Sequence, residues 1–308
     1  MIKQKEFKLI AKLFAFGFLA AIGLLSSCNP EGFKPSPGNY IIQGPQDLEP
    51  AFSPDGNFIA YRHFDDLSNS PGSYATGLYI IDKDGNNRKL VLTGTRLSPA
   101  WSPDGQWLVF SSLGTLQKCK TDGSNLTTFT SLNAQLKYPE FYYPDWTSDG
   151  KYILFDNPFP SDGGGIFRTN YDFTNASRPF SLDQFGRDPE LSQSSPNLVY
   201  YDWVKGWDFS EIFIRDTLGN PVVRLTQNNR DDRNPTWSTD GTRIAWSSNI
   251  RLSIMNADGT NQIEIGYGNT PSWSIYNEIA YSHANANYSK EVLYIISPDG
   301  KNKKQITF

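Results

Sequence analysis

Histidine, cysteine and methionine are scarce in this 308-residue sequence, which contains two of each. The cysteines, Cys28 and Cys119, are too few for a disulfide framework or a cysteine-type zinc site. The histidines, His63 and His283, stand far apart, and no HExxH, GxSxG or metal-spaced cysteine and histidine cluster occurs. We therefore expect no metal site, no cofactor, and no catalytic residue of the zinc-peptidase or serine-hydrolase kind.

The sequence also lacks an excess of positive charge and long helix-forming runs. Lysine and arginine together number 28 against 32 acidic residues, so no basic field is present to attract nucleic acid. Aromatic residues make up 14% of the chain, and 25 glycines and 20 prolines punctuate it. Many aromatic residues between turn formers favour short strands joined by tight turns, which predicts an all-β protein.

The N-terminus carries a basic segment, an apolar run and a cysteine in succession. The uninterrupted apolar stretch 13–25 is short for a membrane span, which needs about 20 residues. The tetrapeptide Leu25-Ser26-Ser27-Cys28 follows and resembles the lipobox of bacterial lipoproteins. The resemblance implies a signal peptide over 1–27, acylation of Cys28 and attachment to the membrane through the acyl chains. We expect the Pro/Gly-rich residues 28–38 to be the tether of a protein that faces the periplasm from the outer membrane.

A short phrase of proline, any residue, an aromatic residue and serine or threonine recurs along the rest of the chain. The steps from one proline to the next are 49, 45, 45, 46 and 36 residues, and the fourth copy has leucine in place of the ring. The six copies begin at Pro50, Pro99, Pro144, Pro189, Pro235 and Pro271. Self-similarity at such a period predicts a repeat architecture.

Each copy continues with further shared elements. A tight turn such as Ser102-Pro103-Asp104-Gly105 comes first, in which proline presets φ and glycine takes the positive φ. An apolar run such as Trp107-Leu108-Val109-Phe110 follows, typical of a strand buried on both faces. A third strand, a second Asp-Gly turn and a fourth strand complete most copies. We therefore predict a six-bladed β-propeller of four-stranded antiparallel blades over residues 39–308.

Two expectations about packing follow from this architecture. Large rings bury most area between adjacent blades, where we expect the tryptophans of the phrase, Trp101, Trp146, Trp237 and Trp273. Residues 40–42 occupy the place of an additional fourth strand. We expect them to pair with the last blade and close the ring, with residues 304–307 as the competing edge.

The repeat resembles that of a known family. The phrase at Pro99 to Gly105, followed by a strand, a turn such as Asp82 to Asn87 and a Leu-Thr pair, is similar to the TolB-type propeller repeat, a WD40-like repeat also called PD40. The resemblance covers nearly all of residues 39–308 and implies the propeller fold. It implies little about function, because one fold supports many functions.

The parity of a four-stranded blade separates two rims. The first and third turns, which hold the Asp-Gly pairs, share one rim, here called the Asp-Gly rim. The second turns and the crossovers between blades share the other, here called the second-turn rim. The Asp-Gly turns are short and regular, which indicates a structural role, whereas the second turns 63–76, 157–164, 203–210 and 283–289 are long and irregular. Rigid scaffolds present binding residues on irregular loops, so we predict binding at the second-turn rim.

The candidate binding residues centre on the segment from Trp203 to Phe209. A tryptophan there is able to stack on a sugar, to anchor a partner protein, or to fold back as a lid on the fourth blade. The candidates from the second turns are Trp203, Trp207, Phe209, Phe159, His63, His283 and Tyr288. Asp145 and Glu190 follow the proline of the phrase, where other copies have alanine, serine or threonine. They are candidates to line the channel mouth and bind a cation or a basic group, or they are two solvated acids at strand starts.

These observations predict a non-catalytic lipoprotein of the cell envelope whose propeller is a binding platform for an envelope protein or a glycan. Its membrane contact is through the acyl chains, and no nucleic acid is expected as a partner. The alternative is an enzyme of carbohydrate or peptide turnover that uses carboxylates at the channel mouth. Asp145, Glu190 and Asp208 keep that alternative open, because a pair of carboxylates can hydrolyse a glycoside.

Overall fold

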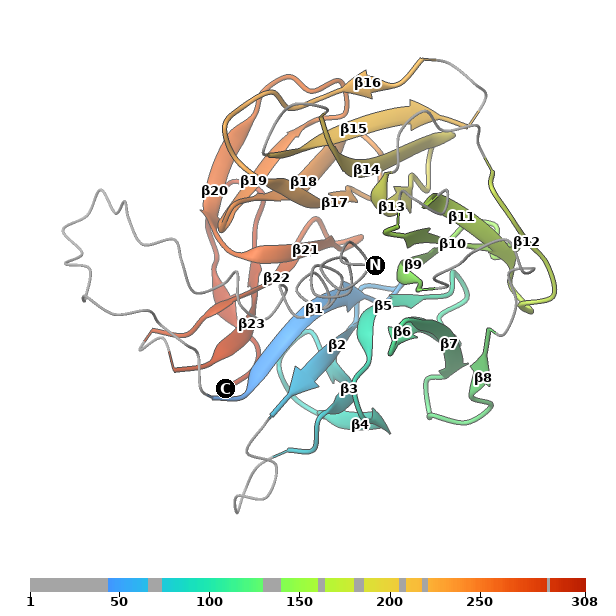
Figure 1. The fold of residues 1–308 in the computed structure, drawn as a ribbon. Coiled ribbons are helices and arrows are strands. Elements are labelled where there is room, and N and C mark those ends of the chain that lie inside the picture. The colour runs from blue at the N-terminus through green and yellow to red at the C-terminus, as the bar shows by residue number, and fades with distance from the viewer. Residues whose placement is uncertain are drawn as a thin grey trace, which may run out of the picture.

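The strands of this protein surround a common centre (Figure 1). The computed structural model describes residues 44–65, 74–129, 140–159, 164–179, 186–204, 209–217, 221–286 and 289–308. These residues form 24 strands and no helix, and the strands divide into six antiparallel units of four. The predicted all-β propeller of four-stranded antiparallel blades is confirmed.

The first three blades follow one another along the chain. Blade one consists of β1 (Gln46–Phe52), β2 (Phe58–Phe64), β3 (Gly77–Asp82) and β4 (Lys89–Thr93). Blade two consists of β5 (Leu97–Trp101), β6 (Trp107–Ser112), β7 (Thr115–Lys120) and β8 (Thr127–Thr128). Blade three consists of β9 (Tyr142–Trp146), β10 (Tyr152–Asn157), β11 (Gly165–Asn170) and β12 (Ala176–Ser177).

The last three blades repeat the pattern. Blade four consists of β13 (Arg187–Leu191), β14 (Asn197–Trp203), β15 (Ser210–Asp216) and β16 (Val223–Arg224). Blade five consists of β17 (Asp232–Trp237), β18 (Arg243–Ser248), β19 (Arg251–Asn256) and β20 (Ile263–Tyr267). Blade six consists of β21 (Asn269–Trp273), β22 (Ile279–Ala284), β23 (Glu291–Ile296) and β24 (Lys304–Gln305). The first strand of each blade lies nearest the centre in Figure 1.

Blades one and six meet without a covalent link between them. Gln46 in β1 pairs with Glu291 in β23 in parallel fashion, which joins the two blades into one hydrogen-bonded sheet. β24, from the C-terminal segment, pairs with β23. This is the competing edge named above, and residues 40–42, which we expected to close the ring, lie outside the described residues.

A β-bulge interrupts the pairing of every innermost strand with the second strand of its blade. The residue just before the proline of the phrase has a φ between 48° and 55°, although none of the six is glycine. These residues are Glu49, Ser98, Tyr143, Asp188, Asn234 and Thr270. A bulge adds one residue and re-aims the side chains beside it. In this fold it turns a side chain of each blade toward the centre.

Tryptophans of the phrase pack in the seams between blades. Trp146, Trp237 and Trp273 are buried, as expected, and Trp237 lies in a cluster that includes Val199 of blade four. Trp101 packs against the cluster between blades one and two but stays half-buried, whereas all four of these tryptophans line the central channel. The seams therefore carry the apolar core of the ring.

The carboxylates of the first Asp-Gly turns are used within their own turns. The Asp104 carboxylate accepts the Ser102 hydroxyl at 2.5 Å, and the Asp240 carboxylate accepts the Ser238 hydroxyl at 2.6 Å and the Thr242 amide at 2.9 Å. Asp55 and Asp149 make equivalent bonds. Such side-chain bonds fix a turn locally, so the structural interpretation of these aspartates is confirmed.

Polar side chains also connect each blade to the next. Most of these bonds run from a side-chain oxygen of one blade to a backbone amide of the following blade, which satisfies both groups inside the ring. Around the ring they are Glu49 with the Ser98 amide, Lys118 with the Tyr171 carbonyl, Asp156 with the Asp188 amide, Glu190 with the Trp237 amide, Ser247 with the Thr270 amide, and Ser272 with the Phe52 amide.

Among the residues that the structure describes, no helix is both long and apolar enough to cross a membrane. The segments proposed as signal peptide, 1–27, and tether, 28–38, lie outside the described residues.

Candidate functional site

A central channel runs between the innermost strands of all six blades. It has a cavity volume of about 260 Å³, and every innermost strand contributes to its lining. First-turn residues such as Pro54, Pro103 and Thr239 also line it, so the channel extends to the Asp-Gly rim. The repeated phrase therefore builds the wall of the cavity as well as the seams.

Two layers of side chains determine the chemistry of this wall. The bulge layer consists of the residue before each proline: Glu49, Ser98, Tyr143, Asp188, Asn234 and Thr270. The second layer consists of the residue after each proline: Ala51, Ala100, Asp145, Glu190, Thr236 and Ser272. The same two backbone positions thus carry different residues in each blade, and a regular scaffold gains an irregular lining.

Acidic residues gather on one side of the channel. Asp145 comes from blade three, and Asp188 and Glu190 come from blade four; we call these three the acidic side. Glu49 of blade one is a further acid in the lining, but its carboxylate accepts the Ser98 amide at 2.6 Å. The structure thus places Asp145 and Glu190 at the channel, where they were predicted. Asp188 is a further acid of the channel that the sequence did not indicate.

Burial changes the protonation of the acidic side. It raises the pKa of Asp145 to about 7. It also raises the pKa of Asp188 to about 7, where the Asn234 amide at 2.9 Å opposes the rise and the charges of Asp156 and Asp145 add to it. The pKa of Glu190 lies well above its usual value because of burial and then the Asp145 charge. Carboxyl groups in such surroundings hold protons near neutral pH.

Asp156 and Arg187 extend the acidic side toward the second-turn rim. Asp156 is fully buried, and its Oδ2 accepts the Arg187 Nε at 2.5 Å and the Asp188 amide at 3.2 Å. Its Oδ1 is buried without a hydrogen-bond partner. Burial raises the pKa of Asp156, and the Arg187 charge opposes that rise. One guanidinium therefore lies among the carboxylates of blades three and four.

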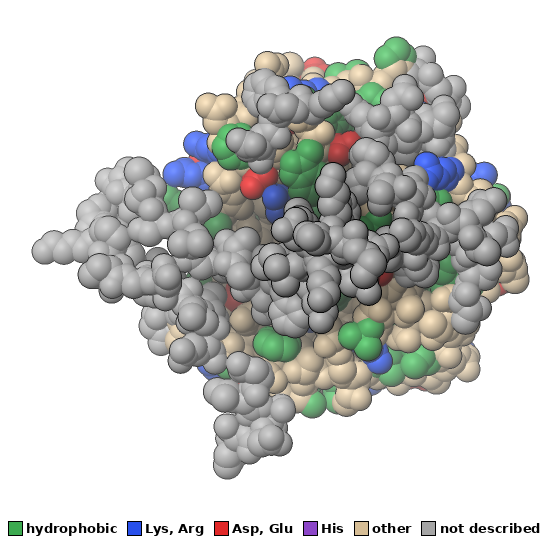
Figure 2. Space-filling model, viewed as in Figure 1, with side chains coloured by type: hydrophobic (Ala, Val, Ile, Leu, Met, Phe, Trp, Pro, Cys, Tyr) green, Lys and Arg blue, Asp and Glu red, His purple; other side chains and the backbone are tan. Residues whose placement is uncertain are grey.

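Trp203 is the exposed aromatic residue of the second-turn rim between blades four and five, with 42% of its surface accessible. Its ring lies 5.7 Å from that of Tyr201 and 5.6 Å from the Arg233 guanidinium. Arg233 is held in turn by Asp231 at 3.1 Å and by the Ser210 hydroxyl at 3.2 Å. We call Trp203, Asp231 and Arg233 the rim patch. Figure 2 shows hydrophobic, acidic and basic side chains side by side over the part of the face where β14, β17 and β18 lie in Figure 1.

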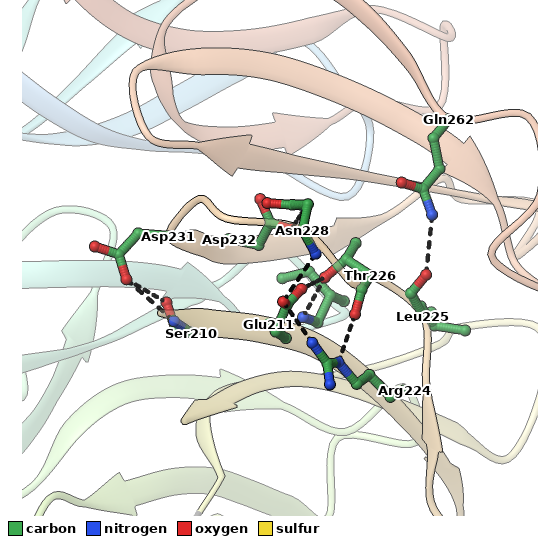
Figure 3. A network of polar contacts seen from close by, with 10 residues as sticks. Ser210, Glu211, Arg224, Leu225, Thr226, Asn228, Asp231, Asp232 and Gln262 are labelled. Carbon is green, nitrogen blue, oxygen red and sulfur yellow. Dashed lines mark hydrogen bonds and ion pairs between the residues drawn. The ribbon is translucent and has the colours of Figure 1, made fainter. Parts of the chain in front are cut away.

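A buried polar network supports the rim patch from below (Figure 3). Glu211, which follows Ser210, is fully buried and binds Arg224 at 2.7 Å and the Thr226 hydroxyl at 2.6 Å. The Ser210 amide and hydroxyl both donate to Asp231 at 3.1 Å. These bonds fix the crossover from blade four to blade five, so the rim patch rests on a rigid base.

Two other candidates of the second turns, His63 in blade one and His283 in blade six, lie in blades other than those of this patch. His63 is buried, with Nδ1 2.7 Å from Asp47 and its ring against Tyr79, so we leave it out of the proposed binding surface. His283 is half-buried beside Tyr267, and burial followed by the Lys303 charge lowers its pKa to about 4. Phe159 and Phe209 are half-buried. Trp207 and Tyr288 lie outside the described residues.

Two acids of the channel, Glu49 and Asp188, stand one residue before the proline of the phrase, outside the segment in which the repeat is most evident. This position is in the bulge layer, where Glu49 and Asp188 are acidic and Ser98, Asn234 and Thr270 are not. An alignment of the six copies that started before the proline would have found both acids. Asp156 near the end of β10 occupies the same repeat position as Ser247 near the end of β18. The contacts of Asp156 depend on the bulge between β9 and β10, for which the sequence has no signal.

The described part of the chain offers no donor set for a metal centre. Within the described ranges, no group of three or more histidine, cysteine, aspartate or glutamate side chains is arranged to hold a metal ion. Cys119 is buried, and burial raises the pKa of its thiol to about 12. Such a thiol is inert near neutral pH.

Ring, seams and channel define the molecule as a β-propeller whose innermost strands form a lined central cavity. A family model described as the TolB beta propeller domain, PD40, matches residues 38–277, and the chain belongs to this family. No curated protein matched the sequence.

Solved structures share this fold at low sequence identity. A putative TolB from Agrobacterium tumefaciens is 16% identical with a TM-score of 0.60, over 71% of this chain and 84% of that one. TolB from Acinetobacter baumannii is 20% identical with a TM-score of 0.61, over 87% of this chain and 64% of that one, so this chain spans less than two thirds of that protein. The tricorn protease is 14% identical with a TM-score of 0.61, over 85% of this chain and 26% of that one. The propeller fold thus occurs in a protease and in other proteins. The structural similarity to these proteins identifies the fold alone.

Proposed function

We propose that this protein is a non-catalytic, lipid-anchored binding platform of the bacterial envelope that recognises a partner protein or glycan at its second-turn rim. The rim patch is the observation that supports this proposal. An exposed tryptophan held between a tyrosine and an arginine is the composition that dominates binding energy in interfaces, and it also suits stacking on a sugar. The Glu211 network below it limits the entropy lost on binding.

Binding is favoured over catalysis because the acids of the second layer also hold the ring together. The Glu190 carboxylate accepts the Trp237 amide at 2.9 Å, and the Asp145 carboxylate accepts the Leu191 amide. A nucleophile or general base needs its oxygen free to meet the substrate. Carboxylates engaged with the next blade are better suited to positioning and charge than to turnover.

The anchor is tested by replacing the acylated residue. We expect Cys28→Ser to abolish incorporation of labelled fatty acid and to move the protein from the membrane fraction to the soluble fraction, because acyl chains provide its membrane affinity. Cys119→Ser is the matched control, because that thiol is buried in the propeller. A Cys28→Ser protein that still carried lipid and sedimented with membranes would refute the anchor.

The rim is tested by capturing partners from native membranes with the acylated protein and measuring affinity for the main partner. We expect Trp203→Ala to weaken binding by about 2 kcal/mol or more, roughly thirtyfold, with the fold intact. Asp240→Ala on the Asp-Gly rim is the control, and it should cost about 1 kcal/mol of stability with unchanged affinity. The reverse pattern would place binding on the Asp-Gly rim.

A further inference from the structure

The polypeptide enters the propeller at the second-turn rim. Gln46 opens β1 opposite Phe64, the last residue of β2. Just before it, the backbone of Gly44 lies against the Ser289 carbonyl in the second turn of blade six. An acyl anchor on Cys28 would therefore hold the propeller by the same rim that carries the rim patch.

The tether is short for the ring that it holds. Fifteen residues separate Cys28 from Gly44, and a fully extended chain of that length spans at most about 55 Å. A compact domain of this size is roughly 45 Å across. The second-turn rim can meet the membrane at any extension of the tether, whereas the Asp-Gly rim could meet it only if the tether ran nearly straight around the whole ring. The anchor thus favours the second-turn rim as the side that faces the membrane.

Leu113 is the most exposed large apolar side chain among the described residues, with 87% of its surface accessible. It lies at the tip of the two-residue turn between β6 and β7, where Ser112 pairs with Thr115. Its φ is 49° and that of Gly114 is 78°. A turn with two positive φ values favours asparagine followed by glycine, because a bulky residue is strained there. The chain therefore accepts strain at this tip and presents a leucine to the solvent.

Packing within the propeller does not account for this strain. The other non-glycine residues with positive φ are the bulge-layer residues, several asparagines, which tolerate that region, and Phe173. Phe173 packs against the apolar cluster that contains Phe129 and Phe155, so burial offsets its strain. Leu113 is too exposed for such an offset. A strained residue that its own molecule does not use indicates contact with another body.

Further apolar and aromatic side chains are exposed around the same rim. Ile250 lies in the corresponding two-residue turn of blade five, between β18 and β19. Blades two and five stand on opposite sides of the ring (Figure 1). Tyr74 and Trp203 are exposed in the second turns of blades one and four, and such rings favour the boundary between an apolar phase and water. Contacts spread in this way suit a flat surface rather than a pocket.

The charges beside Ile250 suit a surface that carries phosphate groups. Three guanidinium groups and two carboxylates are paired there, which leaves one positive charge in excess. Apolar side chains among arginines are typical of surfaces that lie at the boundary of a bilayer, where anionic headgroups attract the positive charge. The charged group consists of Arg230, Arg233 and Arg251 with Asp231 and Glu264.

We propose that the second-turn rim docks on the lipid surface of the membrane in which the protein is anchored, with Leu113 and Ile250 inserted at the boundary of the acyl chains. This inference rests on the anchor of the proposed function and adds the orientation of the platform. Apolar exposure alone does not select this rim, because Ile275 and Tyr276 are exposed on the Asp-Gly rim. The entry point of the tether and the strain at Leu113 select it. A partner of the rim patch would then be a molecule carried by the same membrane.

The orientation is tested with the acylated protein in vesicles of phosphatidylethanolamine and phosphatidylglycerol. A fluorophore is attached to Leu113→Cys; the Cys28 thiol carries lipid, and Cys119 is buried and inert. Leu126→Cys is the matched control, because Leu126 is exposed in the third turn of the same blade, on the opposite rim. We expect brominated lipid to quench most of the emission from position 113 and little from position 126. Equal quenching at the two positions, or quenching at 113 by a water-soluble quencher alone, would overturn the proposal.

Leu113→Asn separates docking from folding. Asparagine suits the positive φ of this turn, so we expect the melting temperature to rise by about 2–4 °C. Lipid quenching of a label on Ile250→Cys should nevertheless fall about twofold, because one of the two inserted tips is lost. Leu126→Asn on the other rim should leave this quenching unchanged. Unchanged quenching in Leu113→Asn would show that the leucine does not hold the rim on the lipid.

The outcomes also separate docking from the anchor. If the protein stays on the vesicles while neither label is quenched by lipid, the anchor stands and docking fails. If position 113 is shielded in native membranes but not in vesicles of lipid alone, the tip contacts a protein and docking on lipid fails. Loss of the acylated protein from the vesicles would refute the anchor itself.

Discussion

Replacing Trp237 by alanine should lower the free energy of unfolding by about 3–5 kcal/mol, which is a large part of the stability of an ordinary domain. The indole is 3% exposed and packs between blades four and five, and its Nε1 donates to the Glu190 carbonyl at 3.2 Å. Truncation therefore removes a large apolar surface, leaves a cavity in a seam and frees a buried carbonyl. Urea unfolding followed by circular dichroism measures the change.

Trp203→Ala is the matched control for this loss, because it removes an indole of the same size from a 42% exposed position. We expect it to cost less than about 1 kcal/mol. Similar costs for Trp203→Ala and Trp237→Ala would mean that the phrase tryptophans do not hold the blades together. Trp101→Ala should lie between the two, since that ring is half-buried at the channel.

The fold could be predicted because each blade repeats the same local sequence pattern. A proline, an aromatic residue and an Asp-Gly turn recur at near-regular steps, and each element is set by short-range chemistry such as the Ser238–Asp240 bond. The departures from the repeat were equally informative. Asp145 and Glu190 differ from their small counterparts in other blades, and both line the channel.

The arrangement of the rims was harder to predict, because it depends on backbone geometry without a sequence signal. The bulge in β1 shifts its register between Leu48 and Ala51, and Asp47 comes to pair with His63 across the strand. The histidine that we expected on the rim is thereby buried beside a carboxylate. Burial of Asp156 depends likewise on the bulge between β9 and β10.

Titration of the channel acids and of the buried Glu291 should make the protein more stable as the pH falls from 8 to 6.5. An acid whose pKa is higher in the folded state than in the unfolded chain binds its proton more tightly when folded, so its stability contribution is complete in acid and is lost as the pH rises through the folded value. Asp145, Asp188 and Glu291 have folded pKa values of about 7, and the pKa of Glu190 is also raised. Summed over these groups and reduced for their coupling, the free energy of unfolding should rise by about 2 kcal/mol over this interval.

The interval is chosen so that other groups contribute little. His283 has a folded pKa of about 4, so its opposing effect develops as the pH falls below its unfolded value of about 6.5. The turn acids, such as Asp240 and Asp149, have lowered pKa values because of their side-chain bonds and lose their contribution only in stronger acid. Urea unfolding at pH 8, 7.25 and 6.5 therefore reports on the channel acids together with Glu291, which lies outside the channel.

Replacing the acids decides whether the channel causes this pH dependence. In Asp145→Asn with Asp188→Asn, two of the groups no longer titrate, and the rise in stability from pH 8 to 6.5 should shrink by about half. At pH 8 this variant should be as stable as the parent or more so, because it no longer confines two charges beside Glu190. Asp240→Asn should keep the parental slope. If the parent were equally stable at both pH values, or if the double variant kept the full slope, the channel acids would already be ionised and compensated in the folded protein.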